Sequence, residues 1–364
     1  MRLRDLGMSV GSLPPGEANA ITDVPGVRVG HTTLISGQGP LVVGRGPVRT
    51  GVTVILPHDE IGTVPVFAGF HRLNGNGELT GLQWVRESGM LGSPVAITNT
   101  HSVGVVRDAL VAADVARRGA GTIYWSLPVV GETYDGRLND INGMHVRPEH
   151  VFAALESAAG GPVPEGNIGG GTGMICHGFK GGIGTSSRRL STGHTVGVLV
   201  QANHGRRERL AVNGVPVGRA IPTSEIPDPY DDAATGTQGS GSIIIVVGTD
   251  APLLPHQCDR LAQRAGMGVA RTGGVGEHTS GDIFLAFSTG NAGKLTSYKV
   301  GVEATTIQIE MLSDLLMNEV YDAVIEATEE AILNALVAAD TMTGRDGITA
   351  HALDPGRLAY AMGY

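Results

Sequence analysis

The pattern of apolar residues along the chain predicts strands and helices that alternate. Several apolar runs are nearly continuous, as in Ile243–Val247, which is typical of strands buried on both faces. The predicted strands are Val52–Leu56, Val95–Thr98, Val196–Ala202, Ser242–Val247 and Asp282–Phe287. Apolar residues at helical spacing predict the helices Val103–Arg117, Glu149–Ala158, Pro255–Arg264 and Asp314–Ala338. The mixture predicts a layered α/β architecture.

Residues at the ends of these helices support their boundaries. Gly119 can end the first helix, and Pro148 suits the first turn of the second. Ser313 is a good N-cap for the last helix. That helix carries an apolar stripe made of Leu316, Val320, Ala323 and Ala327.

One long stretch, from Gly205 to Gly241, is filled with turn-forming residues. It holds four prolines and the sequence DDAATGTQGSG. A loop of this length inside a compact domain is either functional or flexible. Its most basic part, Arg206–Leu210, is interpreted as a solvated loop. Elsewhere no linker stands out, so residues 1–364 are expected to form one domain.

Composition excludes several classes of protein. With 41% hydrophobic and 17% charged residues, the chain is globular and not disordered. A net charge of −9, without a run of five basic residues, argues against nucleic-acid binding. No run of 18 apolar residues predicts a membrane span, and no apolar N-terminal segment predicts a signal peptide. A cytoplasmic location is therefore expected.

The common catalytic and metal-binding motifs are missing or out of context. Cys176 and Cys258 are far apart, so they are expected to be buried free thiols without a structural zinc. A G-x-S-x-G pattern occurs only at Gly7–Gly11, where no strand precedes it. The glycine-rich run Gly169–Gly173 predicts a tight turn or close backbone packing between sheets. No metal or other cofactor is expected.

The informative position is the junction of Gly241 and Ser242. A glycine-rich segment ends there and a buried strand begins. If the chain is cut at this point, Ser242 gains a free α-amine, whose ordinary pKa of about 7.7–8.0 lets it act as a base. Gly241 would allow strained backbone angles before cleavage. By itself this pattern is usually just a turn before a strand, and the wider resemblance described next makes it specific.

Seven ordered blocks give the chain a wider resemblance. They are ITDVPGVRVGHTTL (21–34), TNTHSVGVVRDAL (98–110), PVVGETYDGRLNDING (128–143), GNIGGGTGMICHGFKGGIGTSSR (166–188), VGVLVQANHG (196–205), GSIIIVVGTDAPL (241–253) and SGDIFLAFSTGN (280–291). Through nearly its whole length the chain resembles the DmpA/β-peptidyl-aminopeptidase family of self-processing N-terminal-serine hydrolases. The resemblance implies an αββα sandwich that is cut into chains 1–241 and 242–364. Sharing the mass of 37.5 kDa between the two chains in proportion to their lengths gives about 25 kDa for the first and about 13 kDa for the second.

The resemblance also implies roles for individual residues. Ser242 matches the nucleophile, and Ser280 matches the serine that hydrogen-bonds the amine and hydroxyl of that nucleophile. Asp282 stands where the family has an acidic residue, and alternation along a strand places it on the same face as Ser280. Asn203 matches the oxyanion-hole residue, whose amide N–H stabilises the negative oxygen of the intermediate.

Three further residues match substrate-binding positions. Glu132 matches the carboxylate that holds the free amine of the substrate, which would make the enzyme an aminopeptidase. Tyr134 resembles a tyrosine of the site, and Asn139 is a further candidate of the same kind. The expected substrates are small peptides, amides or esters with a free amine. Kinship also implies a homo-oligomer, a tetramer of cleaved units.

Two other interpretations stay open. An acyltransferase of the ornithine-acetyltransferase type has a similar fold and also cleaves itself, although a Thr nucleophile is expected there instead of Ser242. A chain that does not cleave itself could serve as a binding or scaffold protein. A Ser-His-Asp triad through His204 or His278 is a weaker alternative, since the resemblance gives no histidine a catalytic role.

Overall fold

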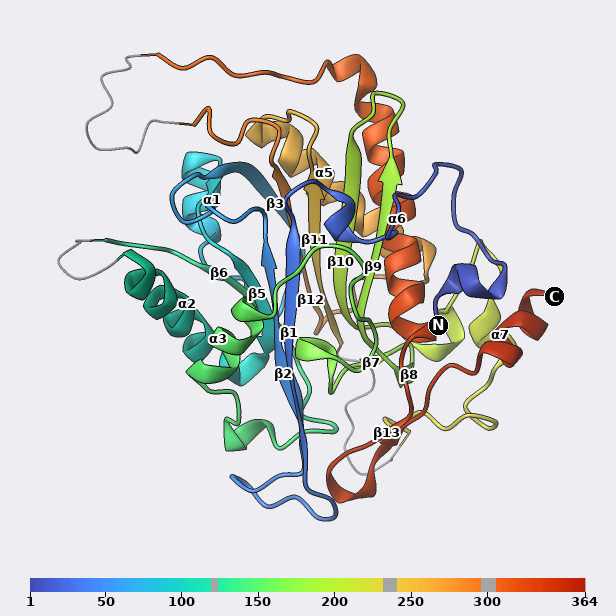
Figure 1. Ribbon diagram of the computed structural model, residues 1–364. Coiled ribbons are helices and arrows are strands. Elements are labelled where there is room, and N and C mark those ends of the chain that lie inside the picture. The colour runs from blue at the N-terminus through green and yellow to red at the C-terminus, as the bar shows by residue number, and fades with distance from the viewer. Residues whose placement is uncertain (119–123, 232–240, 296–305, 364) are drawn as a thin grey trace.

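Two β-sheets face each other at the centre of the molecule, and helices cover the outer face of each sheet (Figure 1). The computed structural model describes residues 1–118, 124–231, 241–295 and 306–363. The strands of the first sheet, in spatial order, are β1 (Arg28–Ser36), β2 (Val48–Leu56), β5 (Val95–Asn99) and β6 (Val129–Thr133). Those of the second are β4 (Met90–Leu91), β3 (Val66–Gly75), β12 (Gly281–Ser288), β11 (Ser242–Thr249), β10 (Thr195–Asn203) and β9 (Gly182–Arg189). The predicted α/β layering is confirmed.

Helices and two small hairpins complete the fold. The helices are α1 (Leu82–Ser88), α2 (Val103–Arg118), α3 (Pro148–Glu156), α4 (Val217–Ala220), α5 (Pro255–Arg271), α6 (Met317–Val337) and α7 (Pro355–Met362). The hairpins pair β7 (Ile175–Cys176) with β8 (Phe179–Lys180) and β13 (Met342–Thr343) with β14 (Thr349–Ala350). Short 3₁₀ turns include Gly169–Gly171, Arg207–Arg209 and Asp314–Leu316.

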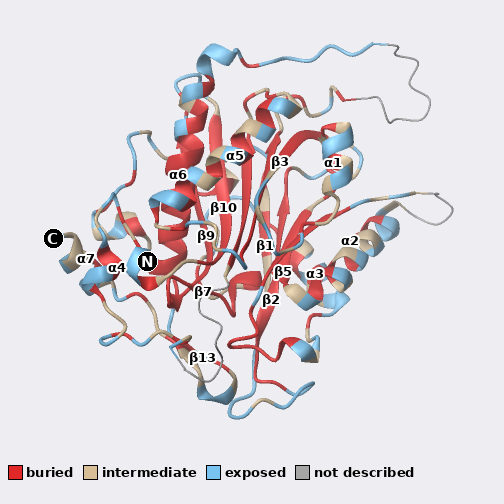
Figure 2. Ribbon diagram, turned by 180° about the vertical axis from the view of Figure 1, so that it is seen from behind, coloured by how far each residue is buried: buried red, intermediate tan, exposed pale blue. Residues whose placement is uncertain are grey.

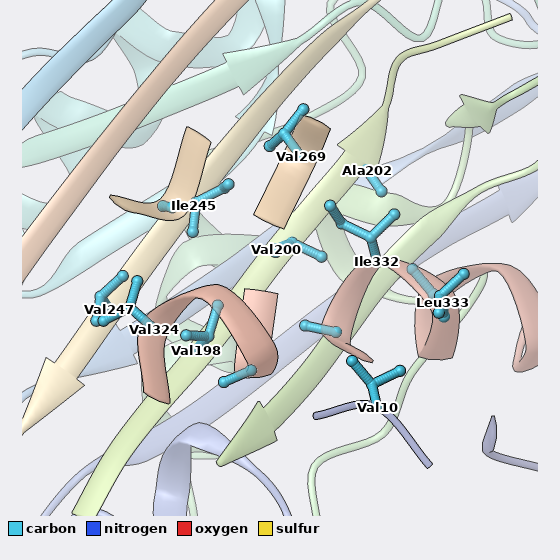
Figure 3. Packing of buried hydrophobic residues seen from close by; sticks show 14 of the residues in the cluster. Val10, Val198, Val200, Ala202, Ile245, Val247, Val269, Val324, Ile332 and Leu333 are labelled. Atoms are coloured by element: carbon cyan, nitrogen blue, oxygen red, sulfur yellow. The ribbon is translucent and has the colours of Figure 1, made fainter. Parts of the chain in front are cut away.

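Buried side chains form three main layers that correspond to these elements. Ile97 of the first sheet and Ile244 of the second belong to the cluster between the sheets. α2 and α3 pack on the outer face of the first sheet, and α5 and α6 on that of the second. Figure 3 shows side chains of α6 beside those of β10 and β11 in this outer layer. The layers therefore have the order αββα.

All five predicted strands and all four predicted helices are found, with shifted ends. α5 continues to Arg271, and a 3₁₀ turn capped by the Ser313 hydroxyl precedes α6. Gly119 and residues 232–240 of the glycine-rich stretch lie outside the described residues. The other long strands β1, β3, β6 and β9 were not predicted. β9 is polar in sequence yet almost entirely buried, because α6 and the N-terminal segment cover it.

The predicted apolar stripe on the last helix is only part of the buried surface of that helix. α6 is buried on nearly every side (Figure 2), whereas Leu316 precedes it and is exposed. Buried acidic side chains on α6 find partners in the first part of the chain. Glu330 accepts hydrogen bonds from Arg188 and Arg4, and Glu326 accepts from Arg188 and from backbone N–H groups of residues 12 and 13.

The stretch from Arg206 to Leu210 is only in part the solvated loop that its charge suggested, since Glu208 and Arg209 are exposed. Arg207 is buried, and its guanidinium donates to the carbonyls of His177, Gly178, Ile221 and Ile226. The glycine run at 169–173 does lie against both sheets: a Cβ on Gly170 would be 2.6 Å from the Ile97 carbonyl oxygen. Within the residues described, no helix combines the length and apolar character needed to cross a bilayer.

Candidate active site

The register of β10 and β11 places Ser242 directly opposite Asn203. Ser242 is the first residue of β11, Asn203 is the last of β10, and the two are paired in antiparallel orientation. Alternation puts both side chains on the face that carries Ile244 and Leu199, which is the face between the sheets. Gln201, two residues before Asn203, confirms this direction because its amide donates to Thr98 and Thr133 of the first sheet.

The hydroxyl of Ser242 is held by a backbone group. The N–H of Gly281 donates to Ser242 Oγ at 3.0 Å, and the side chain of Ser242 is buried. A hydroxyl has one hydrogen to donate and two lone pairs. The bond from Gly281 uses one lone pair and leaves the other, with the proton, for chemistry.

Gly241 packs closely against the end of β10. A Cβ on Gly241 would lie 2.1 Å from the carbonyl oxygen of Asn203 and 2.6 Å from the Cα of His204. Glycine is needed because the chain before Ser242 passes in contact with the end of β10.

Ser280 and Asp282 form a hydrogen-bonded pair beside the start of β11. Ser280 Oγ donates to Asp282 Oδ1 at 2.5 Å, and the backbone N–H of Ile243 also faces this carboxylate. Burial raises the pKa of Asp282 to about 6, and the bond from Ser280 opposes this rise. In the continuous chain Ser280 bonds to Asp282 and not to the Ser242 hydroxyl. Ile283 points between the sheets, so its neighbour Asp282 points to the face covered by helices. The side chain of Ser242 points between the sheets, so the pair lies on the side of its backbone.

The side-chain amide of Asn203 is fixed in one orientation. Its Oδ1 accepts the N–H of Ile175 at 2.8 Å, and its Nδ2 donates to the carbonyl of Tyr134 at 3.0 Å. Because a backbone N–H holds the oxygen, the NH₂ group faces the first sheet. One of its two hydrogens remains for an oxyanion.

Glu132 lies across from the second sheet, near the end of β6. Thr100 Oγ1 donates to its Oε2 at 2.5 Å, and the N–H of Glu78 donates to its Oε1 at 3.0 Å. Burial raises its pKa, and these two hydrogen bonds act in the opposite direction. Gly77 joins the two sides of the site: a Cβ there would be 3.0 Å from Glu132 Oε1 and 3.2 Å from the Cα of Gly281.

The other two substrate-binding candidates have different positions. Tyr134 follows β6, and 43% of its surface is exposed at the site. Asn139 is buried away from it: its Oδ1 accepts the N–H of Arg49, and its Nδ2 donates to Asp135. The Asn139 amide is thus occupied by the backbone of Arg49 and the carboxyl of Asp135. Burial raises the pKa of Asp135 to about 6.

Sequence reasoning missed Thr100 and the backbone N–H of Gly281. Thr100 could have been found, because β5 and β6 are parallel and pair Thr98 with Glu132, so residues just after both strands share one edge. The Gly281 N–H carries no signal in the sequence. The alternative triad has no support here, since His204 Nδ1 lies 3.8 Å from Cys176 Sγ and His278 is exposed.

A cavity of about 290 Å³ adjoins Asn203 and Gly241. Its walls come mainly from the stretch after β10, including Arg206, Asp228 and Tyr230. Within the described residues, the one cluster of possible metal ligands is Cys176, His177 and His204, and His204 also lines this cavity.

Comparison with known proteins adds to this geometry. The model of peptidase family S58 matches residues 19–350. The chain belongs to peptidase family S58. It is 51% identical to β-peptidyl aminopeptidase BapA of Sphingosinicella microcystinivorans, covering 98% of this chain and 90% of that protein. The BapA of Sphingosinicella xenopeptidilytica is 46% identical, with 99% and 90% covered.

Solved structures of S58-like proteins superpose over the whole chain. A β-aminopeptidase of a Burkholderia species has a TM-score of 0.91 at 52% identity, with 100% of this chain and 98% of that one covered. The L-aminopeptidase D-Ala-esterase/amidase of Ochrobactrum anthropi, described as a variant of the Ntn hydrolase fold, has a TM-score of 0.88 at 44% identity, with the same coverage. This S58 chain is therefore a hydrolase, and the acyltransferase and scaffold interpretations are not favoured.

Proposed function

We propose that this chain cuts itself before Ser242 and then works as an N-terminal-serine aminopeptidase and amidase. The observation that carries the proposal is the position of Ser242. It begins a buried strand, its Oγ is held by the Gly281 N–H, and it lies opposite Asn203. A nucleophile on a rigid strand, facing a fixed amide donor, suits attack on a carbonyl.

In the self-cleavage step, Ser242 Oγ attacks the carbonyl carbon of Gly241. The C–O bond forms, the Gly241–Ser242 C–N bond breaks, and the hydroxyl proton passes to the nitrogen that becomes the Ser242 amine. Water then hydrolyses the ester, which leaves the Gly241 carboxylate and restores the Ser242 hydroxyl. The free hydrogen of the Asn203 amide stabilises the oxyanion in both steps.

In turnover, the freed amine of Ser242 takes the proton of its own hydroxyl as Oγ attacks the substrate carbonyl. Ser280, which donates to Asp282, directs a lone pair of its oxygen toward this amine and orients it. The amine returns the proton to the leaving group, and water releases the acyl group by the same route. Glu132 holds the ammonium of the substrate with a charged hydrogen bond.

Both pieces stay in one particle in this proposal. β11 pairs with β10 on one side and with β12 on the other, and β12 pairs with β3, so the two strands from after position 241 lie between strands from before it. Arg188 adds a buried ion pair to Glu330 of α6, and Arg4 adds a partly exposed one. Separation of the two pieces would expose the main core.

For the substrate we propose peptides and amides that begin with a β-amino acid, because the two Sphingosinicella relatives carry the name β-peptidyl aminopeptidase. The Ochrobactrum enzyme's name points to L-amino-acid amides and D-Ala esters and amides. The p-nitroanilides of β-alanine, L-alanine and D-alanine distinguish these classes directly. N-acetylated versions of each test the need for a free amine.

We also propose a cytoplasmic homo-oligomer of cleaved units. Support comes from residues 306–313, which lead to α6 and project from the rest of the molecule (Figure 1). Ile307, Ile309 and Met311 on this segment are exposed and alternate as in a strand that packs on one face. Light scattering after size-exclusion chromatography measures the oligomer, and replacing the three residues with serine is expected to reduce it.

The first experiment is intact mass over time after purification, with N-terminal sequencing of the smaller piece. We expect pieces of about 25 and about 13 kDa, the smaller beginning at Ser242, from the wild type and from the control Ser240→Ala. Ser242→Ala is expected to stay whole and inactive. A wild type that remains whole at neutral pH, or a Ser242→Ala variant that is cut and active, would refute the mechanism.

A further inference from the structure

The hairpin β7–β8 and the end of β10 bring together a thiol and two imidazoles in the interior. Cys176, His177 and His204 are all buried, and each offers one ligand atom within 4.8 Å of the others. Cys176 Sγ lies 3.8 Å from His204 Nδ1, and the centres of the two imidazole rings are 5.2 Å apart. The proposed peptidase chemistry uses none of these three side chains.

The backbone is shaped to hold this group. His177 and Gly178 have φ of +49° and +70°, which makes the tight turn between β7 and β8. The N–H of His177 donates to the carbonyl of His204 at 2.7 Å, so the turn is fastened to the end of β10. A Cβ on Gly205 would lie 2.3 Å from Cε1 of His177, so only glycine leaves room for that ring.

Two nitrogens of the group have no hydrogen-bond partner among the described residues. These are the buried Nε2 atoms of His177 and His204. Nδ1 of His177 faces the carbonyl of Arg206 at 3.0 Å, which places the proton on Nδ1 and a lone pair on Nε2. A metal-bound histidine commonly has this arrangement, and a buried polar atom without a partner calls for an explanation.

We propose that Cys176, His177 and His204 bind one Zn²⁺ ion. Two imidazoles and one thiolate are typical zinc ligands, and three protein ligands leave a fourth position for water. On binding, the Cys176 thiol gives its proton to the solvent, and Zn²⁺ exchanges water ligands for Sγ and two ring nitrogens. No oxidation takes place.

Two cations and one carboxylate lie near the group. The Arg207 guanidinium donates to the carbonyls of His177 and Gly178. The Lys180 ammonium donates to the carbonyls of Gly171, Met174 and Gly181. Both cations are therefore paired with backbone oxygens, and Asp228, whose carboxylate lies against Gly178, supplies negative charge nearby.

The site adjoins the oxyanion residue without touching the reacting atoms. The N–H of Ile175 donates to the side chain of Asn203, and the ligands Cys176 and His204 are the residues that follow these two. The proposed ion would therefore link the two chain segments that this hydrogen bond joins. Bound zinc would thereby fix the Asn203 amide. The sequence showed no cysteine pair, and this ligand set exists only because the hairpin packs on β10.

The test uses the full-length, tag-free protein, stripped with a chelator and titrated with Zn²⁺ by calorimetry. We expect one zinc per chain, release of about one proton and a higher Tm with zinc. Co²⁺ in place of Zn²⁺ should give a thiolate charge-transfer absorption band. Cys176→Ser should lose the band and weaken zinc binding at least about 100-fold, and His177→Asn, which suits the left-handed turn, should weaken it at least about tenfold.

The matched controls are the other buried thiol and another buried histidine. Cys258 contacts the carbonyl of Phe67, and His31 bonds to Thr53, both away from the cluster. Cys258→Ser and His31→Gln are expected to bind zinc as the wild type does. The proposal is wrong if the stripped wild type binds no zinc, if Cys176→Ser, checked as folded by circular dichroism, keeps full affinity, or if the cobalt protein lacks the thiolate band. None of these results bears on cleavage at Ser242.

Discussion

Replacement of Asn203 by alanine separates its proposed chemical role from its structural one. The substitution removes the amide hydrogen proposed for the oxyanion, and loss of one such donor costs about 10²–10³ in rate. It also leaves the N–H of Ile175 and the carbonyl of Tyr134 without their partner. Each orphaned buried group costs about 1–3 kcal/mol of stability, so about 2–6 kcal/mol is expected for the two.

Asn334 in α6 provides a matched control for the structural part. It is also fully buried, its Oδ1 accepts the N–H of Leu3 at 3.0 Å, and its Nδ2 donates to the carbonyl of Thr185 at 2.9 Å. Asn334→Ala therefore loses the same two kinds of hydrogen bond at a place remote from Ser242. Its loss of stability should be similar, and its rates should stay within about threefold of the wild type.

Two assays measure the difference between the variants. Urea unfolding gives their stabilities, and intact mass over time gives the half-time of self-cleavage, a step that forms the same oxyanion. On the cleaved fraction, kcat for β-alanine p-nitroanilide should fall about 100- to 1,000-fold in Asn203→Ala only. Equal rates for the two variants would refute the oxyanion role and assign Asn203 to packing alone.

Three further predictions follow from the site. Gly241→Ala should slow self-cleavage at least about tenfold in a time course of intact mass, because the new Cβ would clash with the Asn203 carbonyl. The control Gly104→Ala, where a Cβ meets open space, should cleave as the wild type does. Equal half-times for the two variants would contradict this prediction. Asp282, with a pKa of about 6, gains a proton as the pH falls through 6, and the neutral carboxyl group then accepts the Ser280 hydroxyl more weakly. The pH profile of kcat/KM should therefore steepen below pH 6 in the wild type and not in Asp282→Asn, and an unchanged profile would remove Asp282 from the relay. Glu132→Gln should lower kcat/KM about 10- to 100-fold for substrates with a free amine and leave N-acetylated ones unaffected; equal losses would argue against amine binding.

The sequence by itself determined the main strands and helices on which the site stands. Ile243–Val247 is apolar at every position, and such a run can only be buried, so β11 was predictable with Ser242 at its start. β9 was not predictable, because its serines and Arg188 are buried only after α6 and the N-terminal segment supply partners. Local pattern fails wherever distant segments satisfy polar groups.

Tertiary structure alone decided what surrounds Ser242. The register of β10 and β11 sets Asn203 opposite it, and the first residue of β12 supplies the Gly281 N–H. Asn139, in contrast, forms its hydrogen bonds with Arg49 and Asp135. Cys176 and His204 are 28 positions apart and meet only because a hairpin packs on the end of β10. Spacing along a chain determines which residues share one face of a strand, but contact between strands depends on register and packing, which no local pattern records.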